Sequence, residues 1–268
     1  MLKKYKFISI LLLLLVFLAA CTSDQTSDTP EKQSETKEEI ELTISAAASL
    51  KDAMDVIQNT YREEHPEVTL NFNFGGSGSL QQQISQGAPV DLFFSAAEDK
   101  FDLLVEEGNI ALEDGVDILG NSLVLVVPKE GKSLIQKFED LLKADIDQIS
   151  IGTPETVPAG KYALESLESL GIWKDIEPKV VYAKDVTQVL SYVETGNVSA
   201  GIVYKTDGIS SDRVNIVATA DPATHTPIIY PVGIIKDSAH YEETKEFYTF
   251  LQSDAALKVF EDYGFITQ

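Results

Sequence analysis

Small and hydroxyl-bearing residues stand where runs of β-branched residues give way to helical patterns. The four segments are 46–49 (Ala-Ala-Ala-Ser), 75–79 (Gly-Gly-Ser-Gly-Ser), 158–160 (Pro-Ala-Gly) and 184–187 (Lys-Asp-Val-Thr). The start of a helix offers main-chain N–H groups without intrahelical partners, together with the positive end of the helix dipole. Several such starts around one point form an anion site without any charged side chain. The pattern therefore predicts binding of an anion rather than covalent chemistry.

Each segment also has a purely structural explanation. Ser49 with Asp52 three residues later is similar to a capping box, the glycines of 75–78 permit a tight turn, and Pro158 suits the first position of a helix. The same arrangement recurs in both halves of the chain, which favours a shared site.

Short runs rich in Val, Ile and Phe alternate with amphipathic stretches from residue 40 onward. This alternation is typical of an α/β protein with βα units on a mainly parallel sheet. The predicted strands are 42–46, 68–74, 91–95, 123–127, 149–152, 180–183, 200–204, 214–218 and 228–235. Helical spacing predicts helices that end at Gly171 and at Gly196, and two short helices near the C-terminus. Ligands of such folds bind beyond the carboxyl ends of the strands, so the four segments should converge on one crevice.

The first residues of the chain have the composition of an export signal. Three lysines among the first six residues precede an apolar run over 7–18, which ends in Ala-Ala before Cys21. The run is too short to span a bilayer, and we predict a lipoprotein signal peptide over 1–20 with lipidation at Cys21. The polar segment 21–40 is typical of a disordered tether. We therefore expect a protein that is lipid-anchored at the outer face of the cell membrane. A buried structural cysteine is the alternative interpretation of Cys21.

Charge and motifs argue against several other classes of protein. The chain carries 43 acidic and 21 basic residues, a net charge of −22, which argues against a nucleic-acid partner. Ser79 stands where a nucleophile elbow around Ser77 requires glycine, and the histidines lie beside no obvious serine or acid motif, so a serine hydrolase is a weak alternative. The sequence contains no pair of cysteines and no His-x-x-x-His pattern for a metal. We expect no enzymatic activity, no cofactor and no metal beyond the ligand itself.

In six segments spread over residues 40–268, the sequence resembles the molybdate-binding proteins of ABC uptake systems. The segments are Ala46 to Leu50 (AAASL), Gly87 to Phe93 (GAPVDLF), Gly120 to Leu123 (GNSL), Val157 to Gly160 (VPAG), Gly201 to Tyr204 (GIVY) and Asp262 to Phe265 (DYGF). The resemblance implies the two-domain periplasmic-binding-protein fold (type II), with the ligand in the cleft between the domains. It also implies that the chain crosses between the domains twice.

Five ligand-binding residues follow from the same resemblance. Ser49 and Ser77 match serines that offer hydroxyl and main-chain N–H donors. Ala159 and Val186 match positions that donate through the main chain, and Tyr204 matches a tyrosine whose hydroxyl completes the ligand shell. The segment 75–79 departs from members that carry a run of serines, which leaves the choice between Ser77 and Ser79 open.

The resemblance implies capture of molybdate or tungstate and delivery to an ABC permease with its ATPase. Sulfate is an alternative ligand, because any fully deprotonated tetrahedral dianion needs donors only. We expect a monomer in which residues 41–119 with 231–268 form one domain and residues 120–230 form the other. The two domains should hinge shut over the ligand.

Overall fold

A computed structural model describes residues 39–130 and 133–268. The described residues form one compact unit. The predicted signal peptide, the lipidation position Cys21 and nearly all of the predicted tether lie outside them. Within the described part of the chain, every helix is too short or too polar to cross a membrane.

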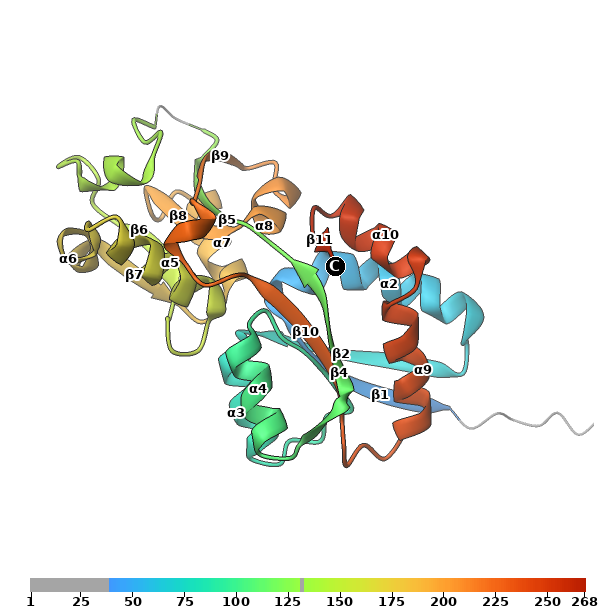
Figure 1. Cartoon of the computed structure of the whole chain (residues 1–268). Coiled ribbons are helices and arrows are strands. Elements are labelled where there is room, and N and C mark those ends of the chain that lie inside the picture. Colours follow the sequence, from blue (N-terminus) through green and yellow to red (C-terminus); the bar gives the residue numbers. More distant parts are fainter. Residues whose placement is uncertain (1–38, 131–132) are drawn as a thin grey trace, which may run out of the picture. The chain divides into compact units, whose positions relative to one another are not determined.

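The first sheet has six strands in the order β11-β4-β10-β3-β1-β2 (Figure 1). The strands are β1 (Ile40–Ala47), β2 (Val68–Gly75), β3 (Leu92–Phe94), β4 (Ile110–Gly120), β10 (Ile229–Ile235) and β11 (Ile266–Thr267). β1 pairs in parallel with β2 and β3, whereas β10 is antiparallel to β3 and β4. The carboxyl ends of the parallel strands therefore meet at one edge, where η1 and α3 begin.

Helices cover both faces of the first sheet. They are η1 (Ala48–Leu50), α2 (Lys51–Glu64), α3 (Ser77–Ser85), α4 (Glu98–Glu106), α9 (Tyr241–Leu251) and α10 (Asp254–Asp262). α2 buries Ala53, Met54, Ile57 and Tyr61, which recur at helical spacing. α3 and α4 lie on the opposite side of the sheet from α2 and α9 (Figure 1). Leu80 of α3 and Phe101 of α4 form a smaller core with Phe93 of the sheet.

The second sheet has five strands in the order β7-β6-β8-β5-β9. The strands are β5 (Leu123–Pro128), β6 (Ile149–Gly152), β7 (Val180–Ala183), β8 (Ala200–Tyr204) and β9 (Val214–Thr219). Its helices are α5 (Pro158–Ser169), α6 (Trp173–Ile176), α7 (Val186–Glu194) and α8 (Lys205–Ser210), with 3-10 turns η2 (Phe138–Leu142), η3 (Glu177–Lys179) and η4 (Pro222–Thr224). Gly171 and Gly196 adopt φ values of 72° and 68° just after α5 and α7, so both helices end where predicted.

The chain passes between the sheets twice. It leaves the first sheet between β4 and β5, through Asn121 and Ser122, and returns between β9 and β10. We call the first sheet with its helices the first lobe, and the second sheet with its helices the second lobe. One continuous apolar core contains residues of both lobes. Movement of the lobes as two hinged domains stays a prediction.

The predicted α/β class, with two helix-flanked sheets, is confirmed. All nine predicted strands are present, but both sheets are mixed rather than mainly parallel. β10 and β5, the first strand after each crossing, run antiparallel to both of their neighbours. β4 was not predicted, because Glu113, Asp114 and Asp117 interrupt its apolar pattern.

Candidate functional site

A small cavity lies where helix starts from both lobes meet. Its walls are formed by Ala47, Ala48, Ser49, Gly75, Gly76, Ser77, Ala96, Val157, Pro158, Ala159, Val186 and Tyr204. All five predicted ligand residues are in this set, and all the residues that form the walls are uncharged. The cavity is small, with a volume of about 10 Å³, which suits about one water molecule. An anion larger than water therefore requires the walls to move apart.

The first lobe contributes two serines. Ser49 lies in the 3-10 turn after β1, and Ser77 is the first residue of α3 after β2. Ser77 is fully buried, and its Oγ accepts a hydrogen bond from the N–H of Ala96 at 2.9 Å. Because Ser77 Oγ accepts this bond, its own hydrogen is available to a ligand. Ser77 is part of the cavity wall, whereas Ser79 is half-buried and is not. The choice of Ser77 over Ser79 as a ligand residue stays a prediction.

The second lobe contributes main-chain groups of two apolar residues. Ala159 is the second residue of α5 and Val186 is the first residue of α7. Both side chains are buried and have no polar atoms, so only their main-chain groups can bind an anion. Asp185 caps α7 through a hydrogen bond from Gln188 N–H at 2.8 Å. The cap holds the start of this helix and leaves the N–H of Val186 free.

The predicted main-chain donors have no partners among the residues that the structure describes. They lie at the starts of helices, where no intrahelical carbonyl reaches an N–H group. Among residues 39–130 and 133–268, no carbonyl of another segment accepts a hydrogen bond from these four N–H groups, which belong to Ser49, Ser77, Ala159 and Val186. A buried N–H group without a partner is costly. The cavity therefore presents donors that a bound anion would satisfy.

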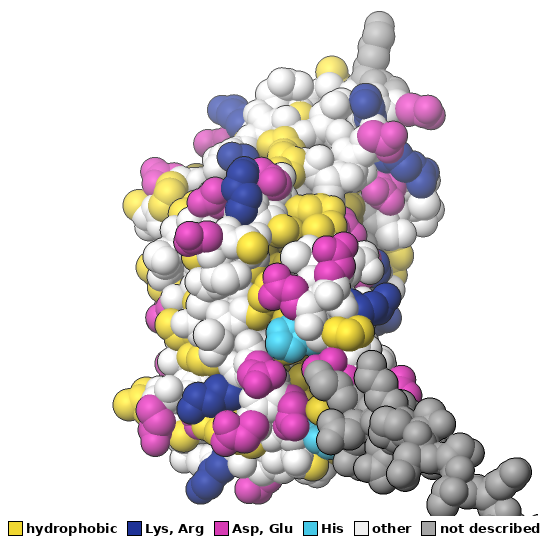
Figure 2. Space-filling view, turned by 90° about the vertical axis from the view of Figure 1, so that its right-hand side faces the viewer, with side chains coloured by type: hydrophobic (Ala, Val, Ile, Leu, Met, Phe, Trp, Pro, Cys, Tyr) yellow, Lys and Arg dark blue, Asp and Glu magenta, His cyan; other side chains and the backbone are white. Residues whose placement is uncertain are grey.

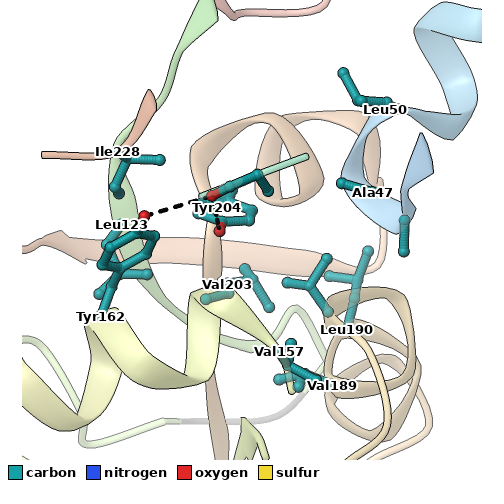
Figure 3. Packing of buried hydrophobic residues seen from close by; sticks show 14 of the residues in the cluster. Ala47, Leu50, Leu123, Val157, Tyr162, Val189, Leu190, Val203, Tyr204 and Ile228 are labelled. Atoms are coloured by element: carbon teal, nitrogen blue, oxygen red, sulfur yellow. Dashed lines mark hydrogen bonds between the residues drawn. The ribbon is translucent and has the colours of Figure 1, made fainter. Parts of the chain in front are cut away.

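Two tyrosine hydroxyls converge on one carbonyl beside the cavity (Figure 3). Tyr204 Oη donates to the carbonyl oxygen of Ala96 at 3.4 Å, and Tyr162 Oη donates to the same oxygen at 3.5 Å. Both distances are long for O–H···O bonds, so Tyr204 can turn to a ligand while Tyr162 keeps the carbonyl partnered. Burial raises the pKa of Tyr204 well above its ordinary 10. The hydroxyl consequently stays protonated and can donate.

Gly76 and Gly78 permit a close approach of the two lobes. Neither adopts a positive φ, so a tight turn does not explain them. A Cβ at Gly76 would lie 2.7 Å from the carbonyl oxygen of Thr156, and a Cβ at Gly78 would lie 2.8 Å from Thr156 Cα. Thr156 belongs to the second lobe, and its carbonyl accepts the N–H of Gly78 at 2.9 Å. The structure thus assigns these glycines to contact between the lobes.

Ser49 does not cap a helix. The N-cap position of α2 is Leu50, and neither η1 nor α2 has a side-chain cap. Ser49 Oγ instead lies 2.9 Å from Tyr230 Oη. The capping-box explanation of Ser49 is therefore wrong, because the serine stands one residue too early and turns toward β10.

Sequence comparison places this architecture in a known family. The bacterial extracellular solute-binding proteins match residues 42–266. The chain belongs to this family. A Bacillus subtilis (strain 168) solute-binding protein, YvgL, which carries the name of an ABC transporter substrate-binding lipoprotein, is 53% identical over 268 residues and covers 100% of both chains.

Two further relatives are named for molybdenum transport. The molybdate-binding protein ModA of Escherichia coli (strain K12) is 37% identical over 238 residues, which cover 85% of this chain and 90% of ModA. A solved structure, named as the substrate-binding domain of a molybdenum ABC transporter from Clostridium difficile, has a TM-score of 0.66 and 42% identity. The match covers 85% of this chain and 99% of the chain in that solved structure. The expected periplasmic-binding-protein fold is confirmed, and the chain is a substrate-binding protein of an ABC transporter.

These relatives of the solute-binding protein bind substrates for transporters and are not enzymes. The structure adds a reason to set a serine hydrolase aside. Ser77 Oγ has Ala96 N–H as its partner. His65, His225 and His240 all belong to the described residues, and none of them forms part of the cavity wall.

The outer surface and the cavity differ in charge. On the face drawn in Figure 2, acidic and basic side chains are interspersed over the surface of the solute-binding protein. An adjoining cavity of about 50 Å³ contains Asp52 of the first lobe and Asp207 of the second, together with Ser49. Burial raises the pKa of Asp207 from its ordinary 3.8 to about 7. A neutral Asp207 would add no negative charge beside an anion.

Sequence reasoning missed Ala96, Tyr162, Tyr230 and Asn121. Ala96 and Tyr162 meet only because segments distant in sequence are folded together. Tyr230 lies in the apolar strand β10, and its sequence pattern predicts the strand but no role at the site. Asn121 lies in the GNSL segment of the resemblance, and this was the one signal that could have found it.

Proposed function

We propose that this solute-binding protein captures molybdate or tungstate and delivers the anion to an ABC permease driven by an ATPase. The ligand residues are Ser49, Ser77, Ala159, Val186 and Tyr204. The protein works as a monomer, held at the outer face of the cell membrane by lipid on Cys21. Cys21 lies outside the described residues, so its lipidation rests on the sequence and agrees with the name of the lipoprotein relative.

The observation that carries the proposal is one uncharged cavity with unpaired donors from both lobes. A fully deprotonated tetrahedral dianion accepts hydrogen bonds at every oxygen and donates none. Phosphate keeps a proton near neutral pH and needs an acceptor. The carbonyl of Ala96 is an acceptor at this cavity, but Tyr162 keeps it partnered when Tyr204 turns to the ligand. The donor set therefore suits molybdate and tungstate better than phosphate.

The molybdenum-related names of the relatives described above support the choice of ligand. Sulfate is the second candidate, because a site of donors suits it equally and because the cavity is small. Molybdate is the larger anion, so the distance between the lobes in the bound state decides between them. We propose that the ranges 41–119 with 231–268 and 120–230 move as two domains that set this distance.

Calorimetric titration of the purified protein with molybdate, tungstate, sulfate and phosphate tests the proposal. We expect molybdate and tungstate to bind with a Kd of about 1 μM or lower, and phosphate to bind far more weakly. Ser77→Ala should raise the molybdate Kd about tenfold, because one donor to the anion is lost. A preference for sulfate would replace molybdate in the proposal, and a failure to bind any of the four anions would reject it.

Small-angle scattering tests the hinge. Addition of molybdate should change the radius of gyration if the lobes move as domains. An unchanged radius at saturating molybdate would contradict the division into two moving domains.

A further inference from the structure

Ser49, which is half-buried, is joined to both crossings between the lobes by a chain of hydrogen bonds through buried Tyr230 and Asn121. Tyr230, on β10 just after the second crossing, is fully buried, with its Oη 2.9 Å from Ser49 Oγ. Asn121, at the first crossing, donates from Nδ2 to Tyr230 Oη at 3.2 Å. Asn121 Nδ2 also donates to Thr206 Oγ1 of the second lobe at 3.0 Å. The chain thus connects one predicted ligand residue to the segments about which the lobes would move.

The partners fix the direction of each bond in this chain. Ser122 N–H donates to Asn121 Oδ1 at 2.8 Å, so the amide nitrogen of Asn121 must face Tyr230 and Thr206. Tyr230 Oη accepts from that nitrogen, and its single hydrogen then needs an acceptor. Among the described residues, Ser49 Oγ at 2.9 Å is the one short remaining contact of the Tyr230 hydroxyl. The Tyr204 hydroxyl also pairs with Tyr230, and besides burial this hydrogen bond raises the pKa of Tyr204, as expected where Tyr204 is the donor.

The opposite direction would leave a buried hydrogen without a free acceptor. If Ser49 donated to Tyr230, the hydrogen of Tyr230 would have to turn to the Tyr204 hydroxyl, which is the donor of that pair, or stay unpaired in a fully buried place at a cost of about 1–3 kcal/mol. Tyr230 also remains protonated, since burial raises the pKa of its hydroxyl well above the ordinary 10. The order of donation is therefore Asn121 to Tyr230 to Ser49. Ser49 Oγ is occupied as an acceptor, and its hydrogen is left for the cavity.

We infer that Tyr230 is a positioning residue that makes Ser49 a hydrogen-bond donor to the bound oxyanion, and that Asn121 sets the direction of the hydrogen bond between Tyr230 and Ser49. The inference rests on the proposed function, because Ser49 acts here as an anion ligand. Tyr230 does not form part of the cavity wall, so it acts on the ligand through Ser49 and not by direct contact. Because Ser49 Oγ already accepts a hydrogen bond from Tyr230, it accepts one from a ligand less readily than it donates one. The site therefore favours a ligand whose oxygens are all acceptors.

The test uses Tyr230→Phe in the full chain. Phenylalanine keeps the ring contacts with Tyr204 and Phe265, whose centroids lie 5.7 Å and 5.4 Å from that of Tyr230. We expect the Kd for sodium molybdate to rise about tenfold in calorimetry. Tyr241→Phe is the matched control, because it removes a hydroxyl that donates to Asp114 at 2.8 Å on a helix that has no part in the cavity wall. Its Kd should equal that of the wild type.

A double-mutant cycle with Ser49→Ala separates positioning from general stability. If Tyr230 acts through Ser49, Tyr230→Phe should change the Kd less than about twofold once Ser49 is alanine. Equal losses in both backgrounds would overturn the inference, as would an unchanged Kd in Tyr230→Phe alone. If the wild type binds none of the tested oxyanions, the proposed function fails and the inference fails with it. Binding by the wild type with no effect of Tyr230→Phe overturns the inference alone.

Asn121→Asp provides a second variant. A carboxylate only accepts, so the hydrogen of Tyr230 would turn to residue 121 and Ser49 would donate to Tyr230. We expect a loss of molybdate affinity at least as large as in Tyr230→Phe, and recovery toward acidic pH as the new carboxylate is protonated. Loss without any dependence on pH would contradict the assigned order of donation.

Discussion

The main-chain N–H of Gly78 donates to the carbonyl oxygen of Thr156 at 2.9 Å, which joins the start of α3 in the first lobe to the segment before α5 in the second. A Cβ built at Gly78 would lie 2.8 Å from Thr156 Cα, against main chain that cannot turn aside. The two lobes can therefore reach the distance seen here only if residue 78 has no side chain.

Gly78→Ala should keep the lobes apart. We expect the Kd for molybdate to rise about tenfold or more, because a Cβ against Thr156 forces the lobes beyond the opening that the anion itself requires, and the donors of the two lobes no longer reach one anion. Calorimetry measures the loss of affinity. Small-angle scattering should show a smaller change on addition of molybdate than in the wild type.

Gly196→Ala is the control for this substitution. Gly196 follows α7 with a φ of 68°, and no atom lies within 4 Å of a Cβ built there. Alanine should cost about 1 kcal/mol of unfolding free energy and leave the Kd unchanged. Wild-type affinity in Gly78→Ala would show that binding does not need this approach of the lobes.

Val186→Pro should remove a main-chain donor and preserve the helix. Val186 is the first residue of α7, where proline is well tolerated. Asp185 has φ −158° and ψ 170°, an extended conformation that suits a residue before proline. We expect an increase of about tenfold or more in the Kd for molybdate, measured by calorimetry.

Val186→Ala separates the side chain from the N–H group. Alanine loses packing, because Val186 is 3% exposed, but it keeps the donor. The expected result is a lower melting temperature with a Kd within about threefold of the wild type. Equal losses of affinity in Val186→Pro and Val186→Ala would argue that the N–H of residue 186 does not bind the anion.

Tyr204→Phe should weaken binding with little effect on the stability of the free protein. The lost bond to Ala96 is long, at 3.4 Å, and Tyr162 still donates to the same carbonyl. We expect the Kd for molybdate to rise about tenfold and the unfolding free energy without ligand to change by less than about 1 kcal/mol. Calorimetry and urea unfolding check the two values. A large loss of stability with full affinity would make Tyr204 a core residue rather than a ligand.

Asp207→Asn should change how stability depends on pH. Because burial raises the pKa of Asp207 to about 7, the folded protein holds a proton that the unfolded chain releases near pH 4. The bound proton of Asp207 therefore contributes fully to the free energy of unfolding at acidic pH. This contribution is lost as pH rises through about 7, and the free energy of unfolding falls by on the order of 1 kcal/mol per pH unit. Urea unfolding of both proteins at about pH 5 and about pH 8 gives the difference. A difference that does not vary with pH would mean that Asp207 titrates at its ordinary pKa.

The strands and helix starts could be predicted because their signals are local. The segment Leu42 to Ala46 is short and alternates apolar residues with Thr43 and Ser45. Gly171 and Gly196 mark the ends of α5 and α7. The convergence of Ser49 and Ser77 followed from the rule that strand ends share one edge of a sheet. Ala159 follows a strand of the other sheet, and its place at the same site was implied by the family resemblance. These expectations required no knowledge of side-chain contacts.

The rest depended on contacts between distant segments. β4 is a strand because it pairs with β10, although its acidic residues obscure the pattern. The same dependence hides the partner of Ser49, since Tyr230 is 181 residues away in sequence. A capping box was the nearest local explanation for Ser49, and it was wrong for that reason.

A cavity built from main-chain amides has a consequence for how the gene can change. Most single-nucleotide changes at Ala159 or Val186 replace one side chain by another and leave the peptide N–H in place, with proline as the exception. The donors at these two helix starts can therefore survive considerable mutational drift in the residues that carry them. Drift at Tyr204 has no such protection, because its donor belongs to the side chain itself.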